Sequence, residues 1–318
     1  MGLFQLLFGK SKPAINKSEQ VSSSENQLPN TDHLKQVEKS KPVSNRGEQT
    51  SLTEDQFLNS DYVKQITAKY GRAATVLHPH KSLTPLASTI SKFGGEPDLR
   101  GFQAYPYCDV CQTPLNFVLQ LYQTDFPEHY FPAGKNLFQL FRCPNHDCAA
   151  AYSEPFYSDL KMFLFYFDTN IAGRQVPMQA TKDGDMETPV PDCELRPEKI
   201  TDYPRYDEFY DVITDMENTY GEELSEIFTD NFNAVQRTKT GGYASYTQSA
   251  HQPVCDCGSN KEFFFQLSSE DTEEGIPNPA PSDQWSPHGI MIGDLGNIYF
   301  YVCKNCGPET IESYWDCY

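Results

Sequence analysis

Two segments of this chain repeat one another, and the repeat is built around cysteines. Cys108 comes thirteen residues after Lys92-Phe-Gly-Gly95, and Cys255 comes thirteen residues after Lys239-Thr-Gly-Gly242. Each copy continues with a Gln-Leu pair and then with an aromatic run that ends at another cysteine. The match indicates a duplicated unit, so we expect two half-domains with the same local architecture.

Each copy carries four cysteines in two close pairs. A tetrahedral zinc site takes four ligands at ~2.0 to 2.3 Å, and a tight turn presents two nearby cysteines to one ion. The pattern therefore predicts two zinc ions, one per copy. Four thiolates leave no position for water, so both sites are predicted to be structural. The predicted ligands are Cys108, Cys111, Cys143 and Cys148 in the first copy, and Cys255, Cys257, Cys303 and Cys306 in the second.

Two details of the ligand sets leave alternatives open. Cys143-Pro-Asn-His146 also has ligand spacing, so His146 could replace Cys148. A site with three protein ligands and one water would be open, as in a zinc-dependent hydrolase or transferase. In the second copy Cys255-x-Cys257 is a tight pair, and Gly258 permits the unusual backbone of such a turn. An iron-sulfur cluster could use the same cysteines.

Apolar stretches in the chain are short. None approaches the roughly 20 apolar residues that span a bilayer. The apolar N-terminal piece, Leu3 to Phe8, is too short for the ~7 to 15 residue core of a signal peptide. A cytoplasmic location is therefore expected. Disulfides do not persist there, so metal thiolates explain the paired cysteines better than a covalent framework does.

Aromatic residues are abundant, with 21 Phe and 19 Tyr, which is typical of strands. A capping box at Thr53-Glu-Asp-Gln56 and apolar residues at helical spacing predict one helix over 54–70. The predicted fold class is mainly β (α+β): an internally duplicated, pseudo-twofold β domain with two zinc-ribbon-like four-cysteine sites and a few peripheral helices. The predicted strands are Pro114–Tyr122, Leu137–Arg142, Met162–Phe167, Phe263–Leu267 and Ile298–Val302.

The chain divides into six predicted parts. Residues 1–12 form a short amphipathic segment that could touch a membrane surface or a partner groove, or else a frayed tail. Residues 13–50 are polar with almost no aromatic residue, which is typical of a disordered linker. The others are an N-terminal helix and lead-in (51–83), a first half-domain with its four-cysteine site (84–175), an acidic, partly helical connector (176–238) and a second half-domain with its four-cysteine site (239–318).

Negative charge dominates the chain and is unevenly distributed. The formal net charge of -19 disfavours nucleic-acid binding, because that affinity depends on Lys and Arg. Residues 181–232 hold 16 Asp and Glu against 4 Lys and Arg, a net -12. This stretch is either a solvated surface or a docking face for a basic partner. An apolar stripe over 206–232 predicts helix, split at Gly221, that packs on the protein's own sheet or, as the alternative, binds in the groove of a partner.

Other candidates for chemistry are sparse. The chain has no Gly-x-Ser-x-Gly, no His-Glu-x-x-His and no phosphate-binding glycine loop. His78-Pro-His80 could bind a metal, but we expect it in a polar, solvent-exposed loop. Cys193 and Cys317 have no close cysteine partner in the sequence and are interpreted as spare thiols.

Several motifs resemble known families. Ser91-Lys-Phe-Gly-Gly-Glu-Pro97, Phe117-Val-Leu-Gln-Leu-Tyr122 and Ile292-Gly-Asp-Leu-Gly-Asn-Ile-Tyr-Phe300 resemble the bacterial YwqG-like family. The cysteine motifs Pro106-Tyr-Cys-Asp-Val-Cys111 and Val254-Cys-Asp-Cys-Gly258 look like those of the related programmed cell death protein 2 family. The resemblance implies a pseudo-twofold β domain, and in eukaryotic members a dedicated chaperone for a small-subunit ribosomal protein.

These observations favour a non-enzymatic, zinc-binding protein-interaction module, a chaperone or adaptor whose partner is a basic protein such as a ribosomal protein. An immunity or antitoxin protein that neutralises a basic toxin is the main alternative. A zinc-dependent hydrolase is the lesser one. We expect no nucleic-acid partner and no membrane span, with at most a weak membrane contact by the N-terminus.

Overall fold

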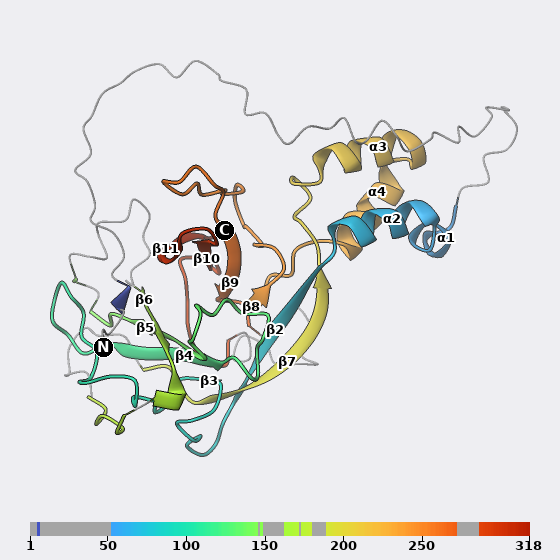
Figure 1. Ribbon diagram of the computed structural model, residues 1–318. Helices are drawn as coiled ribbons and strands as arrows, with labels where there is room; N and C mark the ends of the chain where they lie inside the picture. The colour runs from blue at the N-terminus through green and yellow to red at the C-terminus, as the bar shows by residue number, and fades with distance from the viewer. Residues whose placement is uncertain are drawn as a thin grey trace, which may run out of the picture.

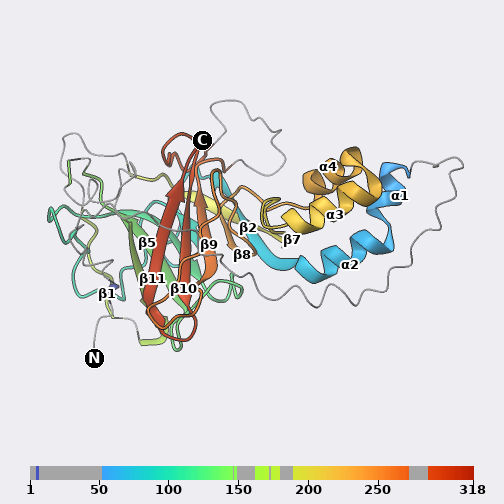
Figure 2. The ribbon, with the colours of Figure 1, turned by 90° about the horizontal axis from the view of Figure 1, so that it is seen from above.

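One antiparallel sheet of eleven strands forms the β part of the described residues. The computed structural model describes residues 5–6, 52–145, 147–148, 162–171, 173–179, 189–271 and 286–318. The sheet is strongly curled, and a small group of helices projects from one side of it (Figures 1 and 2). The strand order is β1-β6-β5-β4-β3-β7-β2-β8-β9-β10-β11. The mainly β fold class predicted from the sequence is confirmed.

The bounds of the elements are as follows. The strands are β1 (Gln5–Leu6), β2 (Arg72–Lys81), β3 (Lys92–Phe93), β4 (Asn116–Tyr122), β5 (Leu137–Arg142), β6 (Met162–Phe167), β7 (Cys193–Asp202), β8 (Lys239–Gly241), β9 (Glu262–Ser268), β10 (Asn297–Cys303) and β11 (Gly307–Asp316). The helices are α1 (Glu54–Leu58), α2 (Asp61–Tyr70), α3 (Tyr210–Tyr220) and α4 (Glu222–Asn231), with a short 3-10 turn, η3, at Thr169–Ile171.

The duplication is visible in the strand order. β3 to β6 lie on one side of the central pair β7 and β2, and β8 to β11 lie in the mirrored sequence on the other side. β2, which begins the first copy, pairs with β8 of the second copy. β7, which begins the second copy, pairs with β3 of the first copy. The two copies have thus exchanged their first strands, and neither half of the sheet is complete without the other.

The two central strands, β2 and β7, fall in the segments predicted as lead-in and connector, and each contains a proline. The amide of Leu77 in β2 donates to the carbonyl of Thr238, 2.9 Å away, so this amide points away from β7. Amides two residues apart point the same way in a strand, so the nitrogen of Pro79 also faces away from β7. Pro197 lies opposite Leu77, at a position where neither residue bonds across the pair. Neither proline therefore removes a ladder hydrogen bond.

The repeated lysine of the Lys-x-Gly-Gly motif forms a buried ion pair in each copy. The Lys92 ammonium lies 2.9 Å from a carboxylate oxygen of Asp192, and the Lys239 ammonium lies 2.8 Å from one of Asp202. Both lysine side chains are fully buried, and Asp202 is buried as well. A charge buried in this way is tolerated only when it is paired. The Lys92 pair therefore links β3 to the residue that precedes β7, and the Lys239 pair links β8 to the last residue of β7.

The second glycine of the motif is required by the same carboxylates. A Cβ at Gly95 would lie 2.0 Å from a carboxylate oxygen of Asp192, and one at Gly242 would lie 2.3 Å from Asp202. Both glycines also have positive φ angles, +66° and +71°, which disfavour any side chain. The motif is thus conformational and structural in both copies.

The repeated Gln-Leu pair places a buried glutamine at the same point of each copy. Gln120 accepts the amide of Asp98 and donates to the carbonyls of Ser88 and Ile90. Gln266 likewise accepts the amide of Ser245. Buried backbone groups need partners, so each glutamine ties loop backbone to its strand.

The main apolar core lies within the curl and draws residues from both halves of the sheet. It joins Phe93, Phe138 and Leu164 of the first copy to Phe265 and Phe300 of the second. A second core covers the other face of the first copy, where Phe117, Phe141 and Phe165 belong to one cluster. In the first copy, the alternation along β5 and β6 sends successive side chains into these two cores.

The four helices form a separate helical lobe beside the ends of β2 and β7 (Figures 1 and 2). The predicted helix 54–70 is two helices, because Ser60 accepts the amide of Val63 and begins α2 anew. The capping box at Thr53 is confirmed at the start of α1. Gly221, with a φ of +96°, separates α3 from α4 as expected.

The apolar stripe of 206–232 does not pack on the sheet, although its pattern predicted that it would. Phe209, Met216 and Phe228 instead pack against Phe57 and Val63 of α1 and α2. Two N-terminal helices supply the apolar surface that one amphipathic pair cannot bury alone. The lobe therefore has its own small core.

Few of the first 51 residues fall within the described part of the chain. Gln5 and Leu6, within the predicted amphipathic segment, form a short strand that pairs with β6. The rest of 1–12 and the predicted linker 13–50 lie outside the described residues. Among the residues that are described, no helix is both long and apolar enough to cross a membrane.

Candidate metal centres

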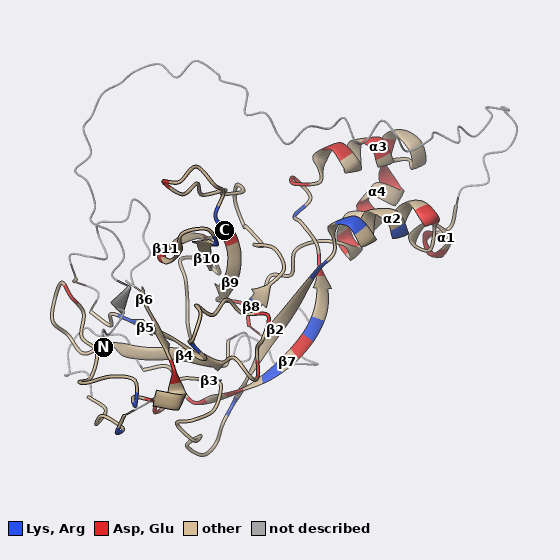
Figure 3. Cartoon of the chain, viewed as in Figure 1, with Lys and Arg blue, Asp and Glu red and all other residues tan. Residues whose placement is uncertain are grey.

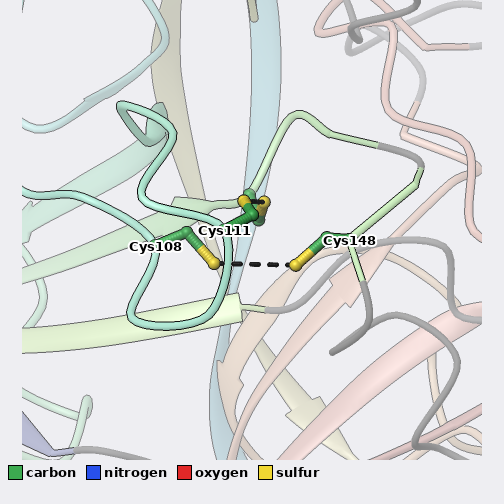
Figure 4. A group of neighbouring side chains, drawn as sticks. Cys108, Cys111 and Cys148 are labelled. Atoms are coloured by element: carbon green, nitrogen blue, oxygen red, sulfur yellow. Dashed lines mark hydrogen bonds between the residues drawn. The ribbon is translucent and has the colours of Figure 1, made fainter.

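The first four-cysteine group lies at one end of the first copy's strands. Cys108 and Cys111 stand on a turn enclosed by the bridge between Tyr107 and Pro114. Cys143 follows directly after β5. The sulfurs of Cys108 and Cys148 are 3.7 Å apart, and those of Cys111 and Cys143 are 3.5 Å apart. Figure 4 shows the side chains converging from these separate segments.

The second group repeats this arrangement in the second copy. Cys255 and Cys257 stand on a turn enclosed by the bridge between Val254 and Asn260. Cys303 ends β10, and Cys306 lies in the turn that leads to β11. The sulfurs of Cys257 and Cys303 are 3.6 Å apart.

The spacing of the sulfurs fits a tetrahedral metal ion. In each group all four sulfurs lie within 4.8 Å of one another. Zinc–sulfur bonds of ~2.3 Å in a tetrahedron place the sulfurs ~3.8 Å apart, whereas a disulfide needs ~2.05 Å. The observed 3.5 to 3.7 Å separations match the first geometry. Both groups can therefore hold a metal ion, and all eight predicted cysteines come together as two sets of four.

The turns that carry the first cysteine pairs are closed by backbone hydrogen bonds. The amide of Cys108 donates to the carbonyl of Thr113, and that of Cys255 donates to the carbonyl of Ser259. Gln112 and Gly258 adopt positive φ angles of 59° and 85° in these turns. The second turn is one residue shorter, and the glycine predicted to permit its backbone does occupy a position that favours glycine.

One thiol of each group is easily ionised. Burial raises the pKa of Cys111, but hydrogen bonds from Thr113 and the neighbouring thiols outweigh it and bring the pKa to about 6. The backbone amide and then the hydroxyl of Ser259 lower the pKa of Cys257 to about 6. Burial raises the pKa of Cys143 far above its ordinary value. Each group thus offers one thiolate with which metal binding can begin.

The other sequence candidates lie elsewhere. His78-Pro-His80 is part of β2 and not of a loop, and the ring of His78 bonds to a carboxylate oxygen of Glu198 at 2.7 Å. Cys193 and Cys317 belong to neither four-cysteine group. His146, the alternative ligand, lies outside the described residues. Cys148, which it would have replaced, completes the first group.

One polar cluster had no signal in the sequence. The Ser286 hydroxyl lies 3.0 Å from Nδ1 of His288, whose Nε2 lies 3.1 Å from Asp271. Nδ1 also accepts the amide of Ile290, so its lone pair is engaged and cannot serve as a base toward Ser286. Asp271 accepts the amide of Thr238 at 2.6 Å. The cluster anchors the segments on either side of 272–285 to the sheet, and its spacing in sequence is too wide to form a recognisable motif.

Comparison with known families identifies the family to which the chain belongs. The profile of the family described as "Domain of unknown function (DUF1963)" matches residues 91–305 and so spans both copies. The chain belongs to this family, whose domain YwqG-like proteins also carry. No curated protein matches the chain.

Proposed function

We propose that this protein is a non-enzymatic protein-binding module that holds a basic client against its helical lobe. The observation that carries the proposal is the charge of the lobe. The helices α1 to α4 contain ten Asp and Glu and two Lys. Figure 3 marks the Asp and Glu positions in red along these helices, with little blue among them.

Four carboxylates of the lobe are placed to meet a partner. Asp211, Glu222, Glu223 and Glu226 are all exposed. Surface charge of one sign steers an oppositely charged protein toward its site and raises the association rate. The same charge repels nucleic acid, so a basic protein is the partner that this surface favours.

The curled sheet supplies a rigid support for the lobe. The α2 helix leads into β2, and β7 leads toward α3. The lobe is therefore connected to the start of one central strand and to the end of the other. We propose that each four-cysteine group holds one structural zinc ion. Structural zinc contributes ~10 to 16 kcal/mol of apparent binding free energy at pH 7, which is comparable with the whole stability of a domain. All four thiols converge in each group, which supports a closed site without catalytic water.

The resemblance to the YwqG-like and programmed cell death protein 2 families supports the same class of function. Eukaryotic members of the latter are dedicated chaperones of a small-subunit ribosomal protein. Ribosomal proteins are strongly basic, and a basic client fits the charge of the lobe. We therefore propose a cytoplasmic chaperone or adaptor role.

The test compares two variants with the same change of net charge. One reverses Asp211, Glu222, Glu223 and Glu226 to Lys. Asp215 is left intact, because it accepts a hydrogen bond from Tyr62 within the lobe. The control reverses four exposed carboxylates of the β domain: Glu96, Glu194, Asp294 and Glu309.

Affinity purification of each tagged full chain from its source cells, followed by mass spectrometry, measures the outcome. Wild type and control should recover the same basic proteins, and the lobe variant should lose them. Recovery should also fall as salt is raised, since the contacts are electrostatic. Recovery of no basic protein, or equal recovery by the lobe variant, would refute the proposal. A basic nuclease in place of a ribosomal protein would favour the immunity-protein alternative.

A further inference from the structure

The two four-cysteine groups differ in how much of their sulfur faces solvent. In the second group Cys257 and Cys306 are exposed, whereas Cys255 and Cys303 are buried. In the first group three cysteines are buried, and only Cys111 has intermediate exposure. The duplicated unit therefore holds one enclosed site and one open site of the same ligand type.

The difference follows from what packs around each group. The first group is part of an apolar cluster that includes Phe117 and Phe141 on the outer face of the sheet. The second lies where β10 turns into β11, and no described apolar cluster includes its cysteines. Beside it the Asn305 amide donates to the Ser259 hydroxyl in an exposed bond of 3.0 Å. Polar surface turns thus border the second group, while aromatic rings cover the first.

Exposure decides which thiolates an oxidant can reach. Thiol oxidation follows thiolate character and solvent access. Metal binding keeps cysteines as thiolates in both groups, so access distinguishes the two. The sulfurs of Cys257 and Cys306 lie within 4.8 Å of each other, close enough for a second thiolate to capture an oxidised first one.

We propose that Cys257 and Cys306 form a modification site for oxidants of the peroxide class, and that their oxidation releases the ion of the second group alone. This inference rests on the zinc ion proposed for each group and does not depend on the partner of the helical lobe. It assigns to the second copy a reactivity that the first copy lacks, although both carry the same four ligands.

The chemistry balances with peroxide as the only oxidant. One thiolate attacks a peroxide oxygen, the O–O bond breaks, and a sulfenic acid and hydroxide form. The second thiolate attacks the sulfenic sulfur, an S–S bond forms, and a second hydroxide leaves. Two protons from solvent convert both hydroxides to water. Two electrons have passed from the sulfurs to the peroxide, and the metal ion, which keeps only two protein ligands, leaves as an aquated dication.

The experiment uses the full chain purified with its metal and titrated with hydrogen peroxide. A chromogenic chelator measures metal release, and peptide mapping after alkylation of free thiols locates the oxidised cysteines. The first equivalent of peroxide should release one of the two metal ions and yield a peptide pair linked through Cys257 and Cys306. The four cysteines of the first group should remain alkylatable and keep their ion.

Single variants provide the matched control. Cys257→Ser and Cys306→Ser should each abolish the early disulfide, whereas Cys111→Ser, at the most accessible cysteine of the first group, should leave it intact. Where a variant fails to fold, the peptide map of the wild type still decides. The proposal is overturned if both ions leave together, if cysteines of the first group are oxidised first, or if the purified protein holds no metal.

Discussion

The most specific prediction concerns His129, a histidine that no sequence motif singles out. Its ring is buried among aromatic side chains, with the ring of Phe138 at 4.5 Å and that of Phe264 at 5.5 Å between centroids. The Thr240 hydroxyl donates to the carbonyl of Phe264, so its oxygen is left to accept from Nδ1 of His129 at 3.1 Å. Nε2 then carries no proton and has no hydrogen-bond partner among the described residues.

Burial lowers the pKa of His129 from 6.5 to about 3. A base with a lowered folded-state pKa stays neutral in the folded protein while it takes up a proton in the unfolded chain. Between these two pKa values the unfolded state therefore binds more protons, and acidification favours unfolding. The stability is fully present above pH 6.5 and is lost progressively as the pH falls toward about 3.

The magnitude follows from the shift. Each pH unit below the unfolded pKa costs ~1.36 kcal/mol, so at about pH 5 the loss from this one residue is roughly 2 kcal/mol. His129→Phe removes the titrating group and keeps an aromatic ring in the aromatic pocket. The free energy of unfolding of wild type should fall by about 2 kcal/mol more than that of the variant between neutral pH and about pH 5.

Urea unfolding of both proteins at the two pH values measures this difference. Both retain all eight cysteines of the two groups, so if metal is bound, its loss in acid affects both proteins equally and cancels in the comparison. His251→Phe is the control, because His251 is 39% exposed and stacks on Tyr314. Replacing this solvent-accessible ring should leave the acid-induced loss that His129→Phe removes. Parallel pH profiles for wild type and His129→Phe would refute the reasoning.

Three further predictions concern the residues that the two copies share. Lys239→Met should lower the free energy of unfolding by ~3 to 5 kcal/mol in urea titrations, because it leaves the fully buried carboxylate of Asp202 unpaired. Lys92→Met should cost less, since the side chain of its partner Asp192 is 19% exposed. Gln120→Leu should cost ~1 to 3 kcal/mol by the same measurement, because it leaves the buried amide of Asp98 without its acceptor, and a neutral result would contradict that role. Gly242→Ala should lower the melting temperature well beyond Gly134→Ala, because both have positive φ but only the first meets a carboxylate; equal shifts would contradict this.

Local patterns in the sequence predicted the parts of this fold that are themselves local. β5 and β6 begin and end where the aromatic runs predicted them to. The cysteine spacing predicted both four-cysteine groups. Each close pair of cysteines is local in sequence, and the two pairs of a group meet because the strands between them pair. The capping box predicted the start of α1 because its hydrogen bonds are local and span three residues.

What the sequence could not indicate depends on distant partners. β2 and β7 were not predicted as strands, because each contains a proline. Pro79 and Pro197 fit because β8 and β3 end before they reach these prolines, and the sequence alone does not show where those neighbours end. The stripe on α3 and α4 was expected on the sheet, because nothing local marks α1 and α2 as its cover. His129 carries no motif, and its lowered pKa arises from burial among aromatic rings contributed by strands of both copies.

The duplication itself separates what the fold requires from what it carries. Both copies keep the buried lysine–aspartate pair, the strand glutamine and the four cysteines, so we expect these features to be the ones that each half of the sheet requires. The features that occur once are different in kind. In the lobe, α3 and α4 follow β7 and have no counterpart among the described residues between β2 and β3. Of the two described four-cysteine groups only the second has exposed cysteines. A feature that the scaffold needs should appear in both halves, so the acidic lobe and the open cysteine pair are the places where partner binding and reactivity are to be sought.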